Sequence, residues 1–219
     1  MFAKDCIDAS IPFLRISDSV EYALDLMQEF KAEALAVVED GKYIGLLSEQ
    51  FLLELDNETS FANIKEHFLP HKIFEETHVF DVLKYTSENV AFFIPVVQAE
   101  NEYIGIVSPQ KLIQVLANNA SLVNNGGILV LEIESRNYSL TEISKIVESN
   151  NAMILHSMIS PAKQPSHVFV SLKINKDDLK DIQLSFERYE YQVIAVLHQS
   201  EYELQLRERY DSLMRYLEV

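Results

Sequence analysis

Histidine and cysteine are the residues of this chain that could ligate a metal ion or act as nucleophiles. His67 and His71 stand four positions apart, a spacing that on a helix would aim both rings at one metal ion. Pro70 interrupts helical geometry between them, and the single cysteine, Cys6, has no cysteine partner and no neighbouring base to activate it. The sequence also has no glycine-rich phosphate loop and no nucleophile elbow. It therefore predicts no metal site and no catalytic residue, so we expect a protein that is not an enzyme.

A second pattern, Tyr-Ile-Gly-x-x-Ser, occurs twice, with Gly45 and Ser48 in one copy and Gly105 and Ser108 in the other. An apolar stretch precedes each serine and a helical apolar pattern follows it. Each serine is therefore placed to cap the N-terminus of a helix with its side-chain oxygen. In the second copy Pro109 fills the first helical position, where its missing N–H costs nothing.

The repeated phrase belongs to an internal duplication, because the segment 36–38 also recurs, as Pro95-Val96-Val97. Each copy reads as strand, helix, two strands and helix, which is a β-α-β-β-α unit. We predict its leading strand at 12–16 in the first copy and at 71–74 in the second. A capping box formed by Asp18 and Glu21 is predicted to start the first helix. The helix after Ser48 is predicted to include Leu55.

Composition restricts the class of partner. Of 219 residues, 34 are acidic and 18 basic, so the formal net charge is −16. Such a chain repels nucleic-acid backbones and anionic lipid surfaces, so we expect neither as a partner. The first ten residues lack the apolar core of a signal peptide, and no uncharged run is long enough to span a bilayer. With one cysteine, these features predict a cytoplasmic protein.

The element order and the residues of the two copies resemble the CBS domain, which usually occurs as a tandem pair called a Bateman module. The matching residues are Ser19-Val20, Ala23-Leu24, the 95–97 strand and the repeated Tyr-Ile-Gly-x-x-Ser phrase. The resemblance implies one CBS repeat at 1–60, a second at 61–120 and a pseudo-two-fold axis between them. It also implies two clefts for adenosyl ligands such as AMP, ADP, ATP or S-adenosylmethionine.

The resemblance carries ligand contacts over to this chain at a defined set of positions. The family's phrase ends in an aspartate that binds the ribose hydroxyls, but Phe51 and Lys111 stand at those positions. Two explanations of the serines therefore stay open: helix capping alone, or capping together with contact to a phosphate or ribose. The implied ligand contacts are Gly45, Ser48, Gly105, Ser108, Pro95 and Val96.

The second half of the chain has a different pattern. After a polar linker, residues 126–198 read as β-α-β-β-α-β, the ferredoxin-like order. Ser139 and Glu142 form a capping box for the first helix, and Asn175 is predicted to cap the second. The order resembles the ACT domain, which senses amino acids between protomers. The resemblance implies a ligand loop at 135–138, where Asn137 is the residue that best tolerates unusual backbone angles.

The C-terminal segment 199–219 has apolar residues at helical spacing, which predicts an amphipathic helix. We expect this helix to pack on its own domain, to contact a second copy or to dock on another protein.

An α+β protein with a tandem CBS pair and an ACT-like domain resembles acetoin-utilisation regulatory proteins. The resemblance implies a non-catalytic homodimeric sensor of an adenosyl metabolite that acts on a partner protein. Two alternatives remain open: a ligand-free dimeric interaction protein, and an amino-acid sensor that uses the ACT-like domain.

Overall fold

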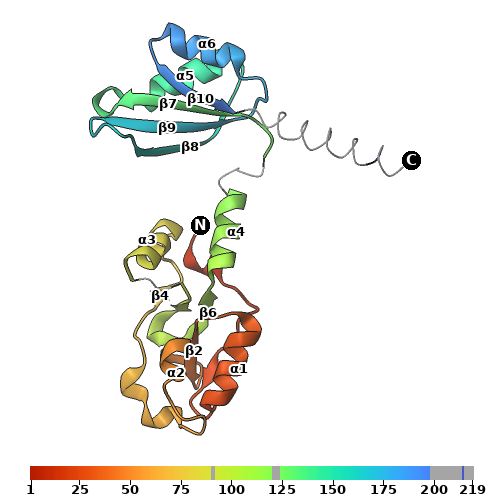
Figure 1. The fold of residues 1–219 in the computed structure, drawn as a ribbon, viewed down its shortest axis with the longest axis vertical. Helices are drawn as coiled ribbons and strands as arrows, with labels where there is room; N and C mark the ends of the chain where they lie inside the picture. Colours follow the sequence, from red (N-terminus) through yellow and green to blue (C-terminus); the bar gives the residue numbers. More distant parts are fainter. Residues whose placement is uncertain (90–91, 120–123, 198–213, 215–219) are drawn as a thin grey trace. The chain divides into compact units, whose positions relative to one another are not determined.

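The computed structural model describes residues 1–89, 92–119, 124–197 and Met214. By internal packing the chain divides into two compact units, Met1–Leu116 and Ala117–Val219 (Figure 1). Each unit has hydrophobic clusters of its own.

The first unit contains the same β-α-β-β-α series twice, with short 3-10 helices (η) added to it. Its first half contains η1 (Ala3–Cys6), β1 (Leu14–Arg15), α1 (Val20–Phe30), β2 (Ala34–Glu39), β3 (Lys42–Ser48), α2 (Glu49–Leu52), η2 (Phe61–Asn63) and η3 (Lys65–His67). Its second half contains β4 (Ile73–Phe74), α3 (Val79–Asn89), β5 (Ile94–Val97), η4 (Ala99–Asn101), β6 (Tyr103–Val107) and α4 (Pro109–Asn119).

The two halves have equivalent sheets, β1-β2-β3 and β4-β5-β6. In each, the first pair of strands is parallel and the second pair antiparallel. The register also corresponds, because Val37 lies opposite Gly45 and Val96 lies opposite Gly105, with an irregularity directly afterwards in both sheets. The predicted duplication and the β-α-β-β-α order are therefore confirmed.

Local residue chemistry explains most boundaries in the first repeat. Asp40 and Gly41 have positive φ angles of 51° and 79°, the backbone that a tight β2–β3 hairpin requires. The predicted start of α1 at Asp18 is wrong by one residue. Ser19 is the N-cap and accepts from the Tyr22 N–H at 3.2 Å, whereas the Asp18 carboxylate accepts from the backbone N–H of Arg15. The helix after Ser48 is also shorter than predicted, since α2 ends at Leu52 and leaves out Leu55.

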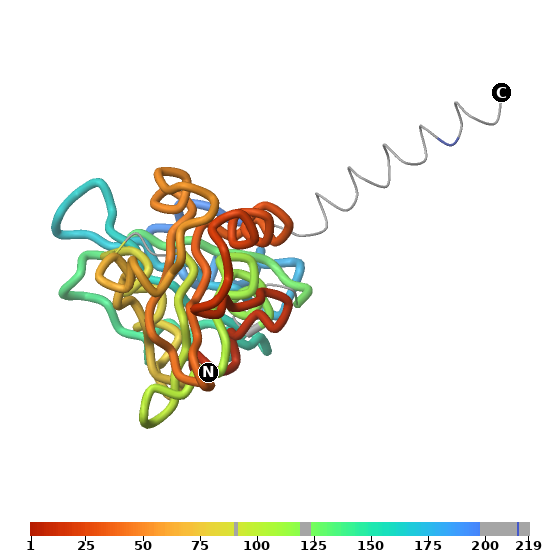
Figure 2. The backbone as a smooth tube through the Cα atoms, turned by 90° about the horizontal axis from the view of Figure 1, so that it is seen from below, coloured from red at the N-terminus to blue at the C-terminus, as the bar shows by residue number. Residues whose placement is uncertain are grey.

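Segments that precede each repeat pack onto the opposite repeat. Residues 2–8 lie against the second repeat, where Ala3 and Cys6 are buried with Val107 in one apolar cluster. Figure 1 shows this red segment beside α3 and α4, and Figure 2 follows its path as a tube. In the same way the segment 60–69 packs on the first repeat, and its Phe61 is fully buried there.

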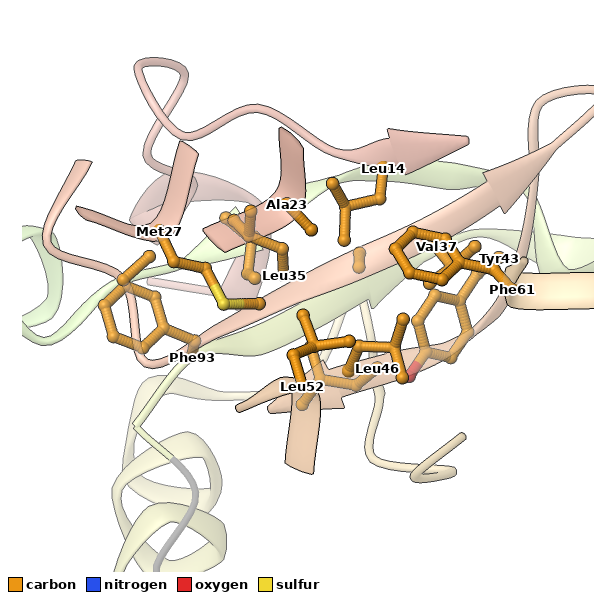
Figure 3. Close-up of a cluster of buried hydrophobic side chains, with 14 of the residues drawn as sticks. Leu14, Ala23, Met27, Leu35, Val37, Tyr43, Leu46, Leu52, Phe61 and Phe93 are labelled. Carbon is orange, nitrogen blue, oxygen red and sulfur yellow. The ribbon is translucent and has the colours of Figure 1, made fainter. Parts of the chain in front are cut away.

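The core of the first repeat includes a side chain from the second. Met27, Leu35, Leu46 and Phe61 are buried in this cluster, and Phe93 from the second repeat packs beside Met27 (Figure 3). The two repeats therefore share apolar side chains.

The second unit contains β7 (Ile128–Glu134), η5 (Ser135–Asn137), α5 (Leu140–Ser149), β8 (Ile154–Pro161), β9 (His167–Ile174), α6 (Lys180–Arg188) and β10 (Gln192–Leu197). Its antiparallel sheet has the order β10-β7-β9-β8. Both helices cover the same face of that sheet (Figure 1). The predicted β-α-β-β-α-β order is confirmed, and the unit has the ferredoxin-like fold expected of an ACT-like domain.

Alternate residues of β7 point into the core under the helices, as the strand period requires. Ser139 caps α5 as predicted, with its oxygen accepting from the Glu142 N–H at 3.3 Å. The prediction that Asn175 caps the second helix is wrong. α6 begins at Lys180, and the Asn175 side chain instead accepts from the Met153 N–H at 2.7 Å.

The predicted C-terminal amphipathic helix, 199–219, lies outside the described residues except for Met214. Among the helices that the structure describes, none combines the length and the apolar character needed to cross a bilayer.

Candidate functional site

The two strands that carry the Gly-x-x-Ser pattern, β3 and β6, are each paired with an extended segment from outside their own sheet. Leu46 of β3 and Leu69 exchange two backbone hydrogen bonds of 2.9 Å. In the second repeat the Asp8 N–H donates to the Ile106 carbonyl at 2.8 Å, and Ile7 pairs with Val107. Leu69 and Asp8 therefore occupy corresponding places, one beside β3 and the other beside β6.

An open cleft of about 410 Å³, here called the first cleft, lies beside β3. Both repeats line it. Its lining residues are Glu33, Ala34, Leu46, Ser48, Glu49, Gln50, Leu69, His71, Asn89, Phe92 and Phe93.

Ser48 is the residue of the repeated phrase that lines this cleft. Its hydroxyl oxygen accepts from the Phe51 N–H at 3.3 Å and caps α2, as the sequence predicts. Phe51, which stands at the family's aspartate position, does not line the cleft. Its ring lies 4.9 Å from the ring of His67 instead. The first cleft therefore keeps a hydroxyl and lacks a carboxylate at the ribose position.

Gly45 is covered by the protein's own chain. A Cβ atom at this position would lie 2.4 Å from the Cβ of Phe68. The segment 60–69 therefore occupies the space beside Gly45, and the absence of a side chain there does not open a path for a ligand from the cleft.

The second serine has a different environment. Ser108 is only 1% exposed, and it caps α4 by accepting from the Lys111 N–H at 3.2 Å. The same hydroxyl donates to Oδ2 of Asp8 at 2.6 Å. Asp8 is thus an internal carboxylate at the place beside Ser108 where the family resemblance expects a ligand.

Two further contacts hold the N-terminal segment at this place. A Cβ on Gly105, whose φ is +151°, would lie 2.4 Å from Cγ2 of Ile7. The backbone N–H and the hydroxyl of Ser10 both donate to Oδ1 of Asp8, at 3.1 and 2.6 Å. Burial raises the pKa of Asp8, but the hydrogen bonds from Ser10 and Ser108 and the charge of Lys111 outweigh it and lower that pKa below its ordinary value.

The other two ligand contacts that the resemblance implies lie in the core, and aromatic side chains of the second repeat differ in their exposure. Pro95 and Val96 lie buried in β5 and do not line the first cleft. Phe93 is buried in the shared core, whereas Phe92 is 46% exposed and lines the cleft. Tyr103 packs edge-on against Phe13, and its buried hydroxyl has no hydrogen-bond partner among the described residues. Burial raises the pKa of Tyr103.

The histidines and the cysteine have structural contacts. Nδ1 of His71 lies 2.8 Å from the Tyr85 hydroxyl, and this histidine also lines the first cleft. Cys6 is buried, and its burial, with the nearby charge of Asp5, raises the pKa of the thiol. Within the described ranges no group of three or more His, Cys, Asp or Glu side chains is placed to hold a metal ion.

The comparison with protein families agrees with the duplicated geometry. The model of the CBS domain matches residues 3–50 and again residues 70–118. The first unit is a tandem pair of CBS domains. The comparison with curated proteins finds no match.

Solved structures of CBS pairs are similar to part of this chain. A CBS domain pair/ACT domain protein from Thermotoga maritima is 24% identical over 54% of this chain and 98% of its own, with a TM-score of 0.48. CBSX2 in complex with AMP is 22% identical over 53% and 96%, with a TM-score of 0.45. A CBS domain pair in complex with 5′-methylthioadenosine and S-adenosylmethionine is 18% identical over 54% and 97%, with a TM-score of 0.43. Each similarity covers about half of this chain.

The cleft that Asn137 of the candidate ligand loop lines in the ACT-like unit is strongly acidic. Asn137 does not have a positive φ angle, and its amide donates to the Glu134 carboxylate at 3.0 Å. It lines a cleft of about 380 Å³ together with Glu132, Glu134, Glu142 and Glu190. The hydroxyl of Tyr191 donates to Glu142 at 2.8 Å, and burial followed by this contact raises the pKa of Tyr191 to about 12. Four carboxylates do not complement the carboxylate of an amino-acid ligand.

Asp8 makes a contact of the CBS pair that can be tested by substitution. Asp8→Ala is expected to lower the free energy of unfolding by about 1.5–3 kcal/mol at neutral pH, because the buried Ser108 hydroxyl loses a charged acceptor. Since the pKa of Asp8 is lowered by folding, its contribution is present above the unfolded value, near 3.8, and is lost as pH falls through the folded value. Urea denaturation at several pH values measures both effects.

The matched control is Asp25→Ala, on the exposed face of α1, where we expect a change within about 0.5 kcal/mol. An Asp8→Ala penalty equal to that of the control would show that the Asp8–Ser108 contact contributes nothing to stability.

Proposed function

We propose that this protein is a non-catalytic regulator that senses an adenosyl metabolite in the first cleft and passes the signal to a partner protein. The observation that carries the proposal is the open cleft between the two CBS repeats, lined by the Ser48 hydroxyl and the half-exposed ring of Phe92. In a CBS pair such a cleft is where the family places its regulatory ligand. CBSX2 has been solved with AMP, and another CBS pair with 5′-methylthioadenosine and S-adenosylmethionine.

The lining has the mixture of groups that a nucleoside needs. Phe92, Leu46 and Leu69 offer apolar surface against which a flat base can pack. Ser48, His71 and Asn89 offer polar groups for ribose hydroxyls and ring nitrogens. These three polar groups would take over the role of the carboxylate that Phe51 replaces.

The position of the cleft suggests how occupancy could be transmitted. Ser48 belongs to the first repeat, whereas Asn89 and Phe92 belong to the second, so a ligand that touches both favours one packing of the repeats over another. We further propose that the protein acts in the cytoplasm as a homodimer, and that its partner is a protein, because the charge of −16 disfavours nucleic acid.

Isothermal titration calorimetry with adenosine, AMP, ADP, ATP, 5′-methylthioadenosine and S-adenosylmethionine tests the proposal. We expect at least one of these compounds to bind, and Phe92→Ala to weaken its binding about tenfold through the lost aromatic contact. Phe80→Ala removes a ring that is 66% exposed and does not line the cleft, and it is expected to leave binding unchanged. Equal effects of the two substitutions would contradict the assignment of the cleft.

A ligand-free interaction protein is the second candidate, and the internal carboxylate at Ser108 favours it. The chain itself fills the place beside the second serine, so the CBS fold can be complete there without a ligand. No heat from any adenosyl compound, together with a specific protein captured by the purified chain, would select this candidate.

A further inference from the structure

We propose that the first cleft selects adenosyl compounds without phosphate groups, either uncharged or cationic, over AMP, ADP and ATP. This inference rests on the proposed function and specifies the ligand class of the same cleft. It follows from the charges that line the cleft and from the local structure that follows Ser48.

Two glutamates, Glu33 and Glu49, are among the residues that line the cleft. The Glu49 N–H donates to the Glu33 carbonyl at 2.8 Å, which holds these two residues side by side. Neither has an ion-pair partner among the described residues, and the lining contains neither lysine nor arginine. A phosphate placed here would meet two like charges and no compensating lysine or arginine in the lining.

The helix after Ser48 does not offset this repulsion. α2 is a single turn of four residues, so it offers little aligned backbone dipole. The Ser48 oxygen already accepts from the Phe51 N–H, and Glu49, the first residue of α2, brings one of the two carboxylates. The place at which the family resemblance expects phosphate contact is therefore acidic in this chain.

The contrast with the second repeat supports the same conclusion. There α4 has 11 residues, Lys111 lies in its first turn, and the negative group beside Ser108 is the carboxylate of Asp8. The surroundings of Ser108 would suit an anionic ligand, but the carboxylate of Asp8 already fills them. The open cleft has the apolar Leu69 at the corresponding place.

The groups that remain in the first cleft suit a nucleoside without phosphate. Ser48, Gln50, His71 and Asn89 supply polar contacts, and the two glutamates attract a cationic tail such as the sulfonium and ammonium groups of S-adenosylmethionine. Adenosine and 5′-methylthioadenosine would avoid the repulsion, whereas each added phosphate would increase it.

Calorimetric titration of the full chain with adenosine, 5′-methylthioadenosine, S-adenosylmethionine, AMP and ATP at low ionic strength measures this selectivity. We expect AMP to bind at least about tenfold more weakly than 5′-methylthioadenosine, and ATP more weakly still. In the double variant Glu33→Gln/Glu49→Gln, the difference in affinity between AMP and 5′-methylthioadenosine is expected to shrink by about tenfold. The same variant is expected to bind S-adenosylmethionine more weakly. Added salt is expected to reduce the same difference in affinity in the unmodified protein, because it screens the repulsion between the glutamates and the phosphate.

The control is Glu58→Gln/Glu76→Gln, which changes the net charge equally at two exposed sites outside the cleft. It is expected to leave the ratio of affinities unchanged. If AMP or ATP binds as tightly as 5′-methylthioadenosine, or if both double variants act alike, the charge selection is wrong while the proposed function survives. If no adenosyl compound binds, the proposed function and this inference fall together.

Discussion

Gly45→Ala is expected to destabilise the CBS pair by about 3 kcal/mol and to abolish ligand binding in the first cleft. The new methyl group would lie 2.4 Å from the Cβ of Phe68, and both atoms are fixed directly to backbone. The two segments would have to separate, which breaks the hydrogen bonds between Leu46 and Leu69. Because both leucines line the cleft, its wall would move with them. Urea denaturation and calorimetric titration measure the two losses.

Gly41→Ala is the matched control for this substitution. A Cβ at Gly41 meets no atom within 4 Å, so the cost is limited to the left-handed backbone, with φ at +79°, and is expected to be about 1 kcal/mol. Ligand affinity should stay unchanged. If the two alanine variants prove equally stable, the contact between β3 and Phe68 is not as tight as described.

Phe186→Ala is expected to destabilise the ACT-like unit by about 3–5 kcal/mol. The Phe186 side chain is completely buried, and its ring packs edge-on against Tyr191 with centroids 5.5 Å apart. Hydrogen exchange is expected to become faster in peptides from residues 128–197 and to stay unchanged in the CBS pair, whose apolar clusters are separate.

Tyr189→Ala, two residues before Tyr191, is the control for the loss of an aromatic ring, because this side chain is 58% exposed. We expect a change within about 0.5 kcal/mol. Faster exchange in the CBS pair of the Phe186→Ala variant would contradict the independence of the two sets of clusters.

Local signals in the sequence were sufficient for most of the fold. Ser48, Ser108 and Ser139 each cap the helix that the pattern predicts, because a cap depends only on residues within one turn. The errors at Asp18 and Asn175 have the same origin. Both side chains can bond to nearby or distant backbone groups as well as to a helix start, and the sequence does not show which bond forms.

The difference between the surroundings of the two serines could not be predicted from the local sequence. Ser48 and Ser108 follow the same phrase, yet one lines an open cleft and the other is bonded to Asp8, which lies a hundred positions earlier in the chain. No short pattern marks Asp8, because its role depends on which repeat the N-terminal segment joins. Once the structure is known, the duplication accounts for the position of residues 2–8, because the segment 60–69 makes the corresponding contacts with the first repeat.

Because residues 2–8 pack on the second repeat, the order of synthesis affects how the CBS pair folds. During synthesis residues 2–8 leave the ribosome long before Val107, the strand residue with which Ile7 pairs, has been made. Residues 2–8 therefore cannot make their native contacts until the second repeat, including Val107, has been synthesised. The second repeat cut from the chain would lack residues 2–8, which complete its apolar cluster, so it is not expected to fold alone.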